Sequence, residues 1–474
     1  MRLWPCERKA LFFALLAALA LAGCTVGPDY VRPPAATSEA FKEMADWKTA
    51  EPADHLLRGN WWEIFHDLAL DELEGQIRIS NQNVAAAEAQ FRQARALVQV
   101  ARSAYFPTAT IGPSFSRSFQ ATPTAPSVPV SLLTLPVDVS WEPDLWGRVR
   151  RSVESSRAGA QASAADLQGV LLSSQTQLAE SYFQLRALDA QSRILDETVE
   201  AYRKSLELTQ NRYESGVASR GDVLQADTQL KTTQAQLIDV GVQRAQLEHA
   251  IALLIGKPPS AFSIPLMALD TLPPVIPVGV PSVLLERRPD IAGAERRMAS
   301  ANAQIGVAIA AFYPTVTLSG TAGYQSVDLS KWLTWPARFW GLGSSVSEVV
   351  YEGGLRKAQT AQARAAYEAT VAVYRQTVLT GFQEVEDNLA ALRILEEEAG
   401  VQAQAVALAE RSLAVITNQY QAGTVAYLNV IVAQTTVLSN RLTALNILGR
   451  RMTAAALLIK ALGGGWNVAE LPKT

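Results

Sequence analysis

The sequence makes the same transition twice, leaving an alanine-rich helical run through a proline for an alternating segment. The first copy reads AYFPTATIGP at 104–113 and the second reads AFYPTVTLSG at 311–320. After Pro314, the apolar residues Val316 and Leu318 alternate with hydroxyl-bearing residues. A period of two indicates a strand with two different faces. The fold must therefore join helices to strands at two equivalent places.

Pro107 and Pro314 are 207 positions apart, and other landmarks keep that offset. For example, SLELTQNRYESG at 205–216 corresponds to SLAVITNQYQAG at 412–423. A repeat this long indicates a duplicated unit of several elements and not a short solenoid repeat. We therefore expect a tandem internal repeat whose two halves share one architecture.

Each half is predicted to contain a long hairpin of two helices. No proline occurs between Gly147 and Tyr213, and apolar residues repeat there every seven positions, which is typical of a coiled-coil seam. At about 1.5 Å per residue, this helix would be on the order of 100 Å long. Gly216 suits a helix C-terminus, and Ser219 or Asp222 suits the start of the returning helix. The two apolar rows are Leu185, Leu188, Leu195, Val199, Tyr202, Leu206 and Tyr213, and Leu230, Leu237, Val240, Leu247, Ile251 and Leu254.

These signals divide the chain into six segments. They are a signal peptide at 1–23, an extended lipidated segment at 24–60, a first repeat at 61–256, a proline-rich linker at 257–289, a second repeat at 290–463 and a tail at 464–474. The first repeat holds strands at 108–119 and 130–141 and a hairpin at 148–256, and the second holds strands at 315–326 and 337–350 and a hairpin at 355–462. No segment after the signal peptide is predicted to cross a bilayer as a helix.

The N-terminus has the features of a bacterial lipoprotein signal. Three basic residues precede an apolar stretch that ends in LAGC at 21–24, which resembles the lipobox. Cys24 is therefore the expected lipid-carrying residue, with an N-acyl diacylglycerol as its covalent group and no other cofactor. A buried N-terminal helix is the alternative, and it fits the basic flank and the small-residue ending less well. Thr25 is not the Asp that often retains such lipoproteins at the inner membrane, so the outer membrane is expected.

Charge and composition argue against several function classes. Of 42 basic and 45 acidic residues, segment 1–23 holds three and one, so the remaining chain has a net charge of −5 and nucleic acid is not an expected partner. The three histidines, His55, His66 and His249, have no companion at metal-ligand spacing, and no nucleophile motif is present. The sequence therefore predicts a protein that is not an enzyme and holds no metal.

Two strands per half leave the chain with four strands, too few to close around a lumen. In lipid every backbone polar group must be paired, so the strands need a closed barrel. A cyclic oligomer closes the ring by pooling strands, which removes the free edges. The expected fold class is an α+β membrane protein: a trimeric 12-stranded β-barrel, with four strands per protomer, continued by a 12-helix coiled-coil barrel.

Several stretches resemble the TolC-type outer-membrane factors, in their NodT/OprM-like lipoprotein branch. They are NWWEIFHD (60–67), WEPDLWGRVR (141–150), RYESGVASRGDVLQA (212–226) and LLERRPDIAGAERRMASANAQIGVAIAAFYPTVTLSG (284–320). The resemblance covers essentially the whole mature chain. It implies a homotrimer in the outer membrane, with a helical domain in the periplasm, that acts as the exit duct of a tripartite pump for drugs or other toxic compounds. The implied partners are outer-membrane lipid, a periplasmic adaptor (membrane fusion) protein and an inner-membrane pump of the resistance-nodulation-division type.

In that family the hairpin tips form the periplasmic entrance and meet the adaptor. Carried over to this sequence, the docking positions are Arg212, Tyr213, Gly216, Ser219 and Asp222 in the first tip and Tyr420 and Gly423 in the second. Many relatives have an Asp in the second tip, whereas QAGTVAYLNV at 421–430 has no acid. We therefore expect an apolar periplasmic gate of Val425, Tyr427 and Leu428, with Asp222 as the residue that could replace the missing charge.

Three other functions remain open. The first is the outer-membrane duct of a type I protein secretion system. The second is a periplasmic adaptor lipoprotein, which would have one hairpin flanked by lipoyl-like modules, and the third is a structural coiled coil, which would leave the strands unexplained.

The aromatic residues near the last strand also have two interpretations, a membrane-interface girdle or packing over the barrel mouth; they are Trp332, Trp335, Phe339 and Trp340.

Overall fold

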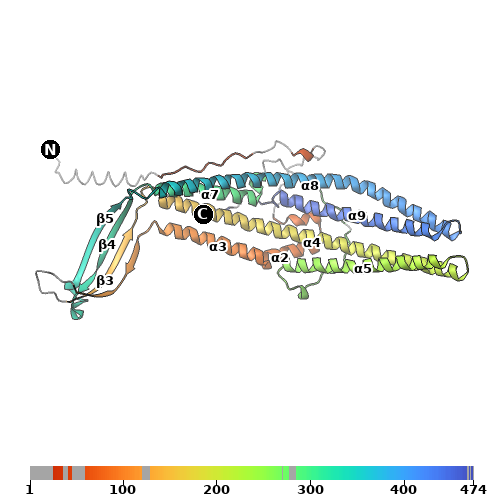
Figure 1. Ribbon diagram of the computed structural model, residues 1–474, viewed down its shortest axis with the longest axis horizontal. Coiled ribbons are helices and arrows are strands. Elements are labelled where there is room, and N and C mark those ends of the chain that lie inside the picture. Colours follow the sequence, from red (N-terminus) through yellow and green to blue (C-terminus); the bar gives the residue numbers. More distant parts are fainter. Residues whose placement is uncertain are drawn as a thin grey trace.

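In the computed structural model, the chain forms a long bundle of helices with a β-sheet at one end and two hairpin tips at the other (Figure 1). The structure describes residues 25–35, 41–44, 59–119, 129–269, 271–276, 284–466, 469 and 471–472. The predicted signal peptide and Cys24 lie outside these residues. The described part begins at Thr25, directly after the predicted lipid-carrying residue.

The two halves of the chain form the same helices at the same offset. Helix α3 (Gln82–Ser103) corresponds to α7 (Pro289–Ala310), α4 (Arg148–Glu214) to α8 (Leu355–Gln421) and α5 (Arg220–Leu254) to α9 (Tyr427–Ala461). The members of each pair have equal lengths, of 22, 67 and 35 residues. The offset is kept at both ends of each helix, so the internal repeat is confirmed.

One antiparallel sheet contains the strands of the described residues. They are β1 (Thr108–Ile111), β2 (Ser114–Ser118), β3 (Val130–Trp141), β4 (Thr315–Ser326) and β5 (Arg338–Ser347). The order is β1, β3, β4, β5, with β2 also paired to β3, so the β3–β4 ladder joins the two halves of the chain. Within the described residues, the outer edges of β1 and β5 have no partner strand. Two free edges are what a ring of several copies requires.

The strand predicted at 108–119 is interrupted in the structure. β1 and β2 pair with β3 in one continuous register, and the interruption falls at Gly112 and Pro113. Proline has no N–H to donate to the ladder. Pro113 therefore divides the strand in two without shifting its register.

The last strand is shorter than the predicted 337–350 and ends at Ser347. Beyond it, the Arg356 guanidinium forms an ion pair of 2.8 Å with Glu348 and donates to the carbonyl oxygen of Val349 at 2.7 Å. These bonds hold Glu348 and Val349 against the start of α8. The two residues therefore do not continue the pairing with β4.

The helical region before Pro107 consists of two helices, because Asn81 ends α2 (Leu68–Ser80) and caps α3. The linker predicted at 257–289 contains the short helices η4 (Pro259–Ala261) and α6 (Leu284–Arg287), and α7 already begins at Pro289. Proline is favourable at a first helical position because its missing N–H has no helical partner there.

The main hydrophobic core lies in the middle of the bundle. Helices η3 (Trp61–Phe65) and α2 pack there against α4, and residues of α5, α8 and α9 complete the cluster. The rings of Phe65 and Phe183 are 4.8 Å apart between centroids, and Trp61 is buried beside them. This core holds the two hairpins together at about the level where α5 and α9 end.

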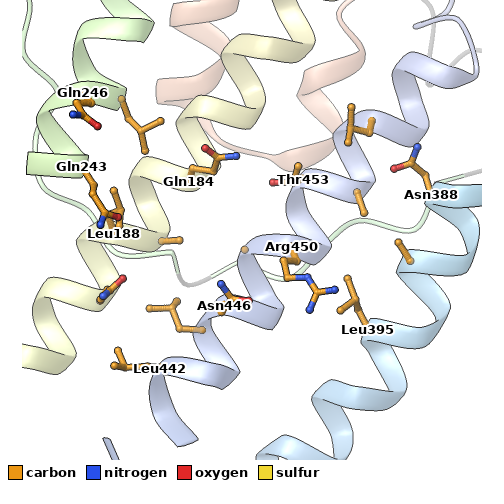
Figure 2. Close-up of a pocket in the computed structure, with 18 residues that line it drawn as sticks. Gln184, Leu188, Gln243, Gln246, Asn388, Leu395, Leu442, Asn446, Arg450 and Thr453 are labelled. Carbon is orange, nitrogen blue, oxygen red and sulfur yellow. The ribbon is translucent and has the colours of Figure 1, made fainter. Parts of the chain in front are cut away.

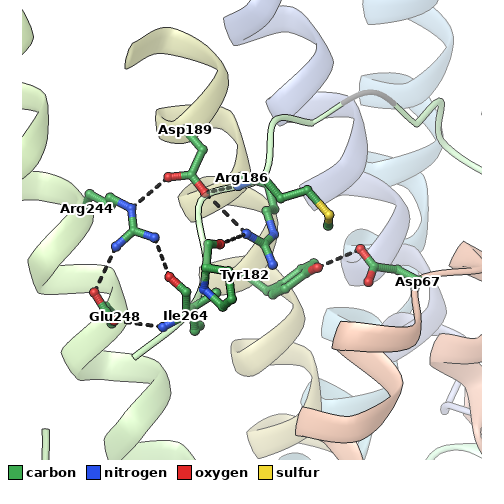
Figure 3. Close-up of polar contacts among 9 residues, drawn as sticks. Asp67, Tyr182, Arg186, Asp189, Arg244, Glu248 and Ile264 are labelled. Atoms are coloured by element: carbon green, nitrogen blue, oxygen red, sulfur yellow. Dashed lines mark hydrogen bonds and ion pairs between the residues drawn. The ribbon is translucent and has the colours of Figure 1, made fainter. Parts of the chain in front are cut away.

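A buried ion network fixes the linker against the first hairpin (Figure 3). Asp189 on α4 accepts from Arg244 of α5 at 2.7 Å and from Arg186 at 3.2 Å. Both arginines also donate to linker carbonyls at 2.7 Å, Arg186 to Pro265 and Arg244 to Ile264. The Asp189 side chain is 2% exposed, so the network is shielded from water and favours one arrangement of α4, α5 and the linker.

Among the described helices, α9 is long and apolar enough to cross a membrane by length and composition, which the sequence prediction missed. In the structure α9 packs along α8 and α4, and 44% of its most apolar window is buried. We therefore assign α9 to the second hairpin.

Candidate functional site

The two hairpin tips have the same turn. Loop 215–219 connects α4 to α5 and loop 422–426 connects α8 to α9. Gly216 and Gly423 have φ angles of 75° and 77°. This left-handed conformation costs little free energy only for glycine. After each glycine, an N–H returns to a carbonyl five residues earlier: Val217 to Arg212 at 2.8 Å and Thr424 to Gln419 at 3.0 Å. Both helices thus end in the same left-handed glycine cap.

The start of the returning helix differs between the tips. In the first, Ser219 and Asp222 form a capping box, in which Asp222 N donates to Ser219 Oγ and Ser219 N donates to Asp222 Oδ2 at 3.0 Å. In the second, Ala426 and Asn429 occupy these positions, and the Ala426 side chain has no group that can cap the helix. The Asp222 carboxylate is therefore already bonded within its own tip.

An aromatic cluster lies just behind the second tip. Tyr420 and Tyr427 are buried with ring centroids 5.3 Å apart, and they pack with Ala226 of α5 and Val430 of α9. The hydroxyl groups of Tyr427 and Ser205 are 3.0 Å apart, so α4 is bonded to α9 here. Burial raises the pKa of Tyr427 above the ordinary value of a tyrosine hydroxyl.

Arg212 connects the two tips of the protomer. Its guanidinium carbon lies 4.7 Å from the centroid of the Tyr420 ring, and its Nη1 donates to the carbonyl oxygen of Gln421 at 3.2 Å. The contact combines a cation–π interaction with a hydrogen bond. The sequence identified Arg212 and Tyr420 separately, but it did not predict that they touch.

The predicted docking and gate residues fall into two groups. Tyr427 is 2% exposed and belongs to the aromatic cluster, against which Val425 is partly buried. By contrast, Leu428 is 56% exposed and Tyr213 is 44% exposed. The exposed residues are available to another copy or to a partner, whereas Tyr427 supports the tip from inside.

A groove of about 1030 Å³ lies between the two hairpins, nearer the main core (Figure 2). Its walls come from α4, α5, α8 and α9, and they carry amide side chains such as Gln184, Gln243 and Asn446 beside Leu188 and Leu442. Direct contact between the hairpins is made mainly by α4 with α9. The groove therefore lies where α5 makes few contacts with the second hairpin. Farther along the bundle, the two tips are in contact again.

No group of three or more potential metal ligands occurs among the residues that the structure describes. The candidate sites for contacts between chains are the tips and the sheet edges. Both sites suit contacts between chains, because they present exposed side chains and unpaired backbone groups at opposite ends of the molecule (Figure 1).

The sequence profile of the outer membrane efflux protein family matches residues 73–257 and 280–464, once for each repeat. TtgC of Pseudomonas putida, a probable efflux pump outer membrane protein, is 30% identical over 465 residues, which cover 97% of this chain and 96% of TtgC. OpmQ of Pseudomonas aeruginosa, a pyoverdine export outer membrane protein, is 30% identical over 416 residues, which cover 86% and 87% of the two chains.

Solved structures have the same fold. The outer-membrane channel OprN superposes with a TM-score of 0.87 at 31% identity, covering 94% of this chain and 100% of OprN. VceC, an outer membrane protein of Vibrio cholerae, superposes with a TM-score of 0.79 at 27% identity, covering 85% and 98%. The sequence profile, the relatives and the structures agree along nearly the whole chain. The chain therefore belongs to the outer membrane efflux protein family and is an outer-membrane efflux channel.

Proposed function

We propose that this protein is the exit duct of a tripartite efflux pump, built as a homotrimer whose twelve strands close a barrel in the outer membrane. The observation that carries the proposal is the five-stranded sheet, in which β1 and β2 together occupy one edge and β5 the other, and from which long helical hairpins continue. When β1 of one copy pairs with β5 of the next, the backbone groups at these two edges form hydrogen bonds that lipid could not supply. The hairpins of three copies then form a helical barrel in the periplasm.

The partners follow from the opposite end of the molecule. The tips meet a periplasmic adaptor, and the adaptor joins the duct to an inner-membrane pump of the resistance-nodulation-division type. Exposed Tyr213 and Leu428 supply apolar contact area for the adaptor, while the glycine turns at Gly216 and Gly423 set the shape of the docking surface. Drugs or other toxic compounds leave through the lumen, and the duct performs no catalysis.

A lipid on Cys24 fits the path of the adjacent residues. Thr25 lies so close to Gly147, at the start of α4, that a Cβ on this glycine would come within 2.8 Å of Thr25 Cγ2. Val26 N donates to the carbonyl oxygen of Trp146 at 3.2 Å, and Arg151 forms an ion pair of 2.8 Å with Asp29. Acyl chains on Cys24 would thus start beside the junction of sheet and helices, where the inner face of the outer membrane is expected.

Deletion of the gene followed by a panel of antibiotics, dyes, detergents and solvents tests this function. We expect increased susceptibility to some of these compounds, restored by the wild-type gene and not by a gene with both tips disrupted. Unchanged susceptibility together with loss of one secreted protein would instead support the duct of a type I secretion system.

A further inference from the structure

A small cavity lies away from the tips, where η3, α2 and α4 meet the turn that follows α9. Its volume is about 290 Å³, and its lining includes Trp62, Asp71, Glu74 and Trp466. Residues 463–465 form one wall with their backbone, and a side chain on Gly464 would collide with Leu172. The cavity is therefore closed on that side by glycine, and its other walls include acids and aromatic rings.

Glu74 is the unusual residue of this cavity. Its side chain is fully buried, and neither carboxylate oxygen has a hydrogen-bond partner. Asp71 lies one turn earlier on the same face of α2, and its Oδ1 also has no partner. Arg78 lines the same cavity, but it is exposed to solvent and forms no ion pair with Glu74. Buried carboxylates are normally paired. Three unpaired oxygens in one cavity therefore favour a ligand that donates hydrogen bonds to them.

The charged groups around the cavity favour a cation. Burial raises the pKa of Glu74 well above its ordinary range, and the nearby Asp71 raises it further. The pKa of Asp71 is raised by burial and by Glu63 and Asp67, and it is lowered by His66. Burial therefore favours the protonated form of Glu74 in the empty cavity, whereas a bound cation favours the carboxylate form.

The other sides of the cavity add aromatic and neutral groups. Trp62 and Trp466 supply rings of the kind that attract cations, and α4 supplies the uncharged amides of Gln168 and Gln175. The volume lies at the lower limit of small-molecule pockets, which are about 300 to 1,000 Å³. The ligand is therefore small.

We propose that this cavity binds a small primary amine as its ammonium ion. A primary ammonium has three N–H donors, which match the three unpaired oxygens of Glu74 and Asp71. A quaternary ammonium has no N–H and would leave these oxygens unpaired. A multivalent metal ion requires more carboxylate or imidazole ligands than the described residues bring together. This site lies apart from the tips and does not depend on the proposed partners.

Isothermal titration of the purified full-length protein with n-butylamine at pH 7.5 tests the proposal. We expect binding to the wild type, at least tenfold weaker binding to Glu74→Gln, and wild-type binding to Glu72→Gln, which removes an exposed carboxylate from the same helix. Titrations in two buffers with different ionisation enthalpies should reveal proton release on binding. A purely structural role of Glu74 would give no such release.

Two control ligands each lack one feature of the amine. Tetramethylammonium has the charge but no N–H donors, and n-butanol has no charge. Binding of either one as tightly as n-butylamine, or equal binding of n-butylamine to wild type and Glu74→Gln, overturns the proposal. So does the absence of n-butylamine binding to the wild type. Should Glu74→Gln not fold, Asp71→Asn takes its place, with weaker binding again expected.

Discussion

Arg212 of the first hairpin lies over the ring of Tyr420 of the second, with 4.7 Å between the guanidinium carbon and the ring centroid. The same guanidinium donates to the carbonyl oxygen of Gln421. One side chain thus joins the two tips of a protomer at the end farthest from the sheet (Figure 1). Separation of the two tips of a protomer would break this contact.

Replacing Arg212 with alanine should loosen the tips. Cation–π pairs contribute about 0.5–2 kcal/mol, so we expect a higher resting conductance of trimers in planar bilayers with little change in melting temperature. Arg203→Ala is the matched control, because Arg203 is exposed and pairs with Glu200 on its own helix. Equal conductance of the two variants would contradict a closing role for Arg212.

Valine at Gly216 and at Gly423 should impair docking of the adaptor. Both glycines have a positive φ, and a β-branched residue there costs about 1 kcal/mol or more and distorts the turn. We expect reduced efflux with a normal amount of trimer. Gly400→Val is the control, since Gly400 lies within α8 and has open space around it. Wild-type export by both tip variants would show that docking does not use these turns.

The apolar gate predicts different effects of Val425→Asp and Asp222→Ala. Like charges from three copies near one axis repel, so Val425→Asp should raise single-channel conductance. Asp222 is bonded to Ser219 in a capping box, so its loss should weaken the start of α5 by about 1 kcal/mol and change conductance little. If Asp222→Ala alone opens the channel widely, closure depends on an acidic network.

Stability should depend on pH through Glu74. Its pKa is raised in the folded protein, so it contributes no penalty below its ordinary pKa of about 4.3, where both folded and unfolded chains are protonated. As pH rises from there through the raised folded value, unfolding releases a proton and stability falls. Without added amine, Glu74→Gln should therefore melt at a higher temperature than wild type at pH 7.5 and at a similar one at pH 4. A constant difference across this range would place the effect in packing and not in charge.

The sequence predicted the helices well because each signal occurs twice. The turn glycines and the proline-free runs have counterparts at the same offset, so Gly147 and Gly354 mark the start of equivalent helices. The break at Pro113 was missed because the alternation continues across it. A proline near a predicted edge strand was the available signal.

The sites were harder to predict because they depend on which helices lie side by side. Tyr213 and Tyr420 occupy equivalent positions of the two repeats, yet Tyr213 is exposed and Tyr420 is buried under Arg212. Periodicity within one helix cannot distinguish them. Glu74 did have a signal, since it follows Leu70 and Leu73 on the apolar face of α2.

In the proposed trimer the strands, and not the lipid, carry the protein through the outer membrane. The most direct measurement is the fate of Cys24→Ala expressed behind a cleavable signal that is not lipidated. We expect trimers in the outer-membrane fraction that are extracted only by detergent. Quantitative recovery of a soluble monomer from the periplasm would contradict it.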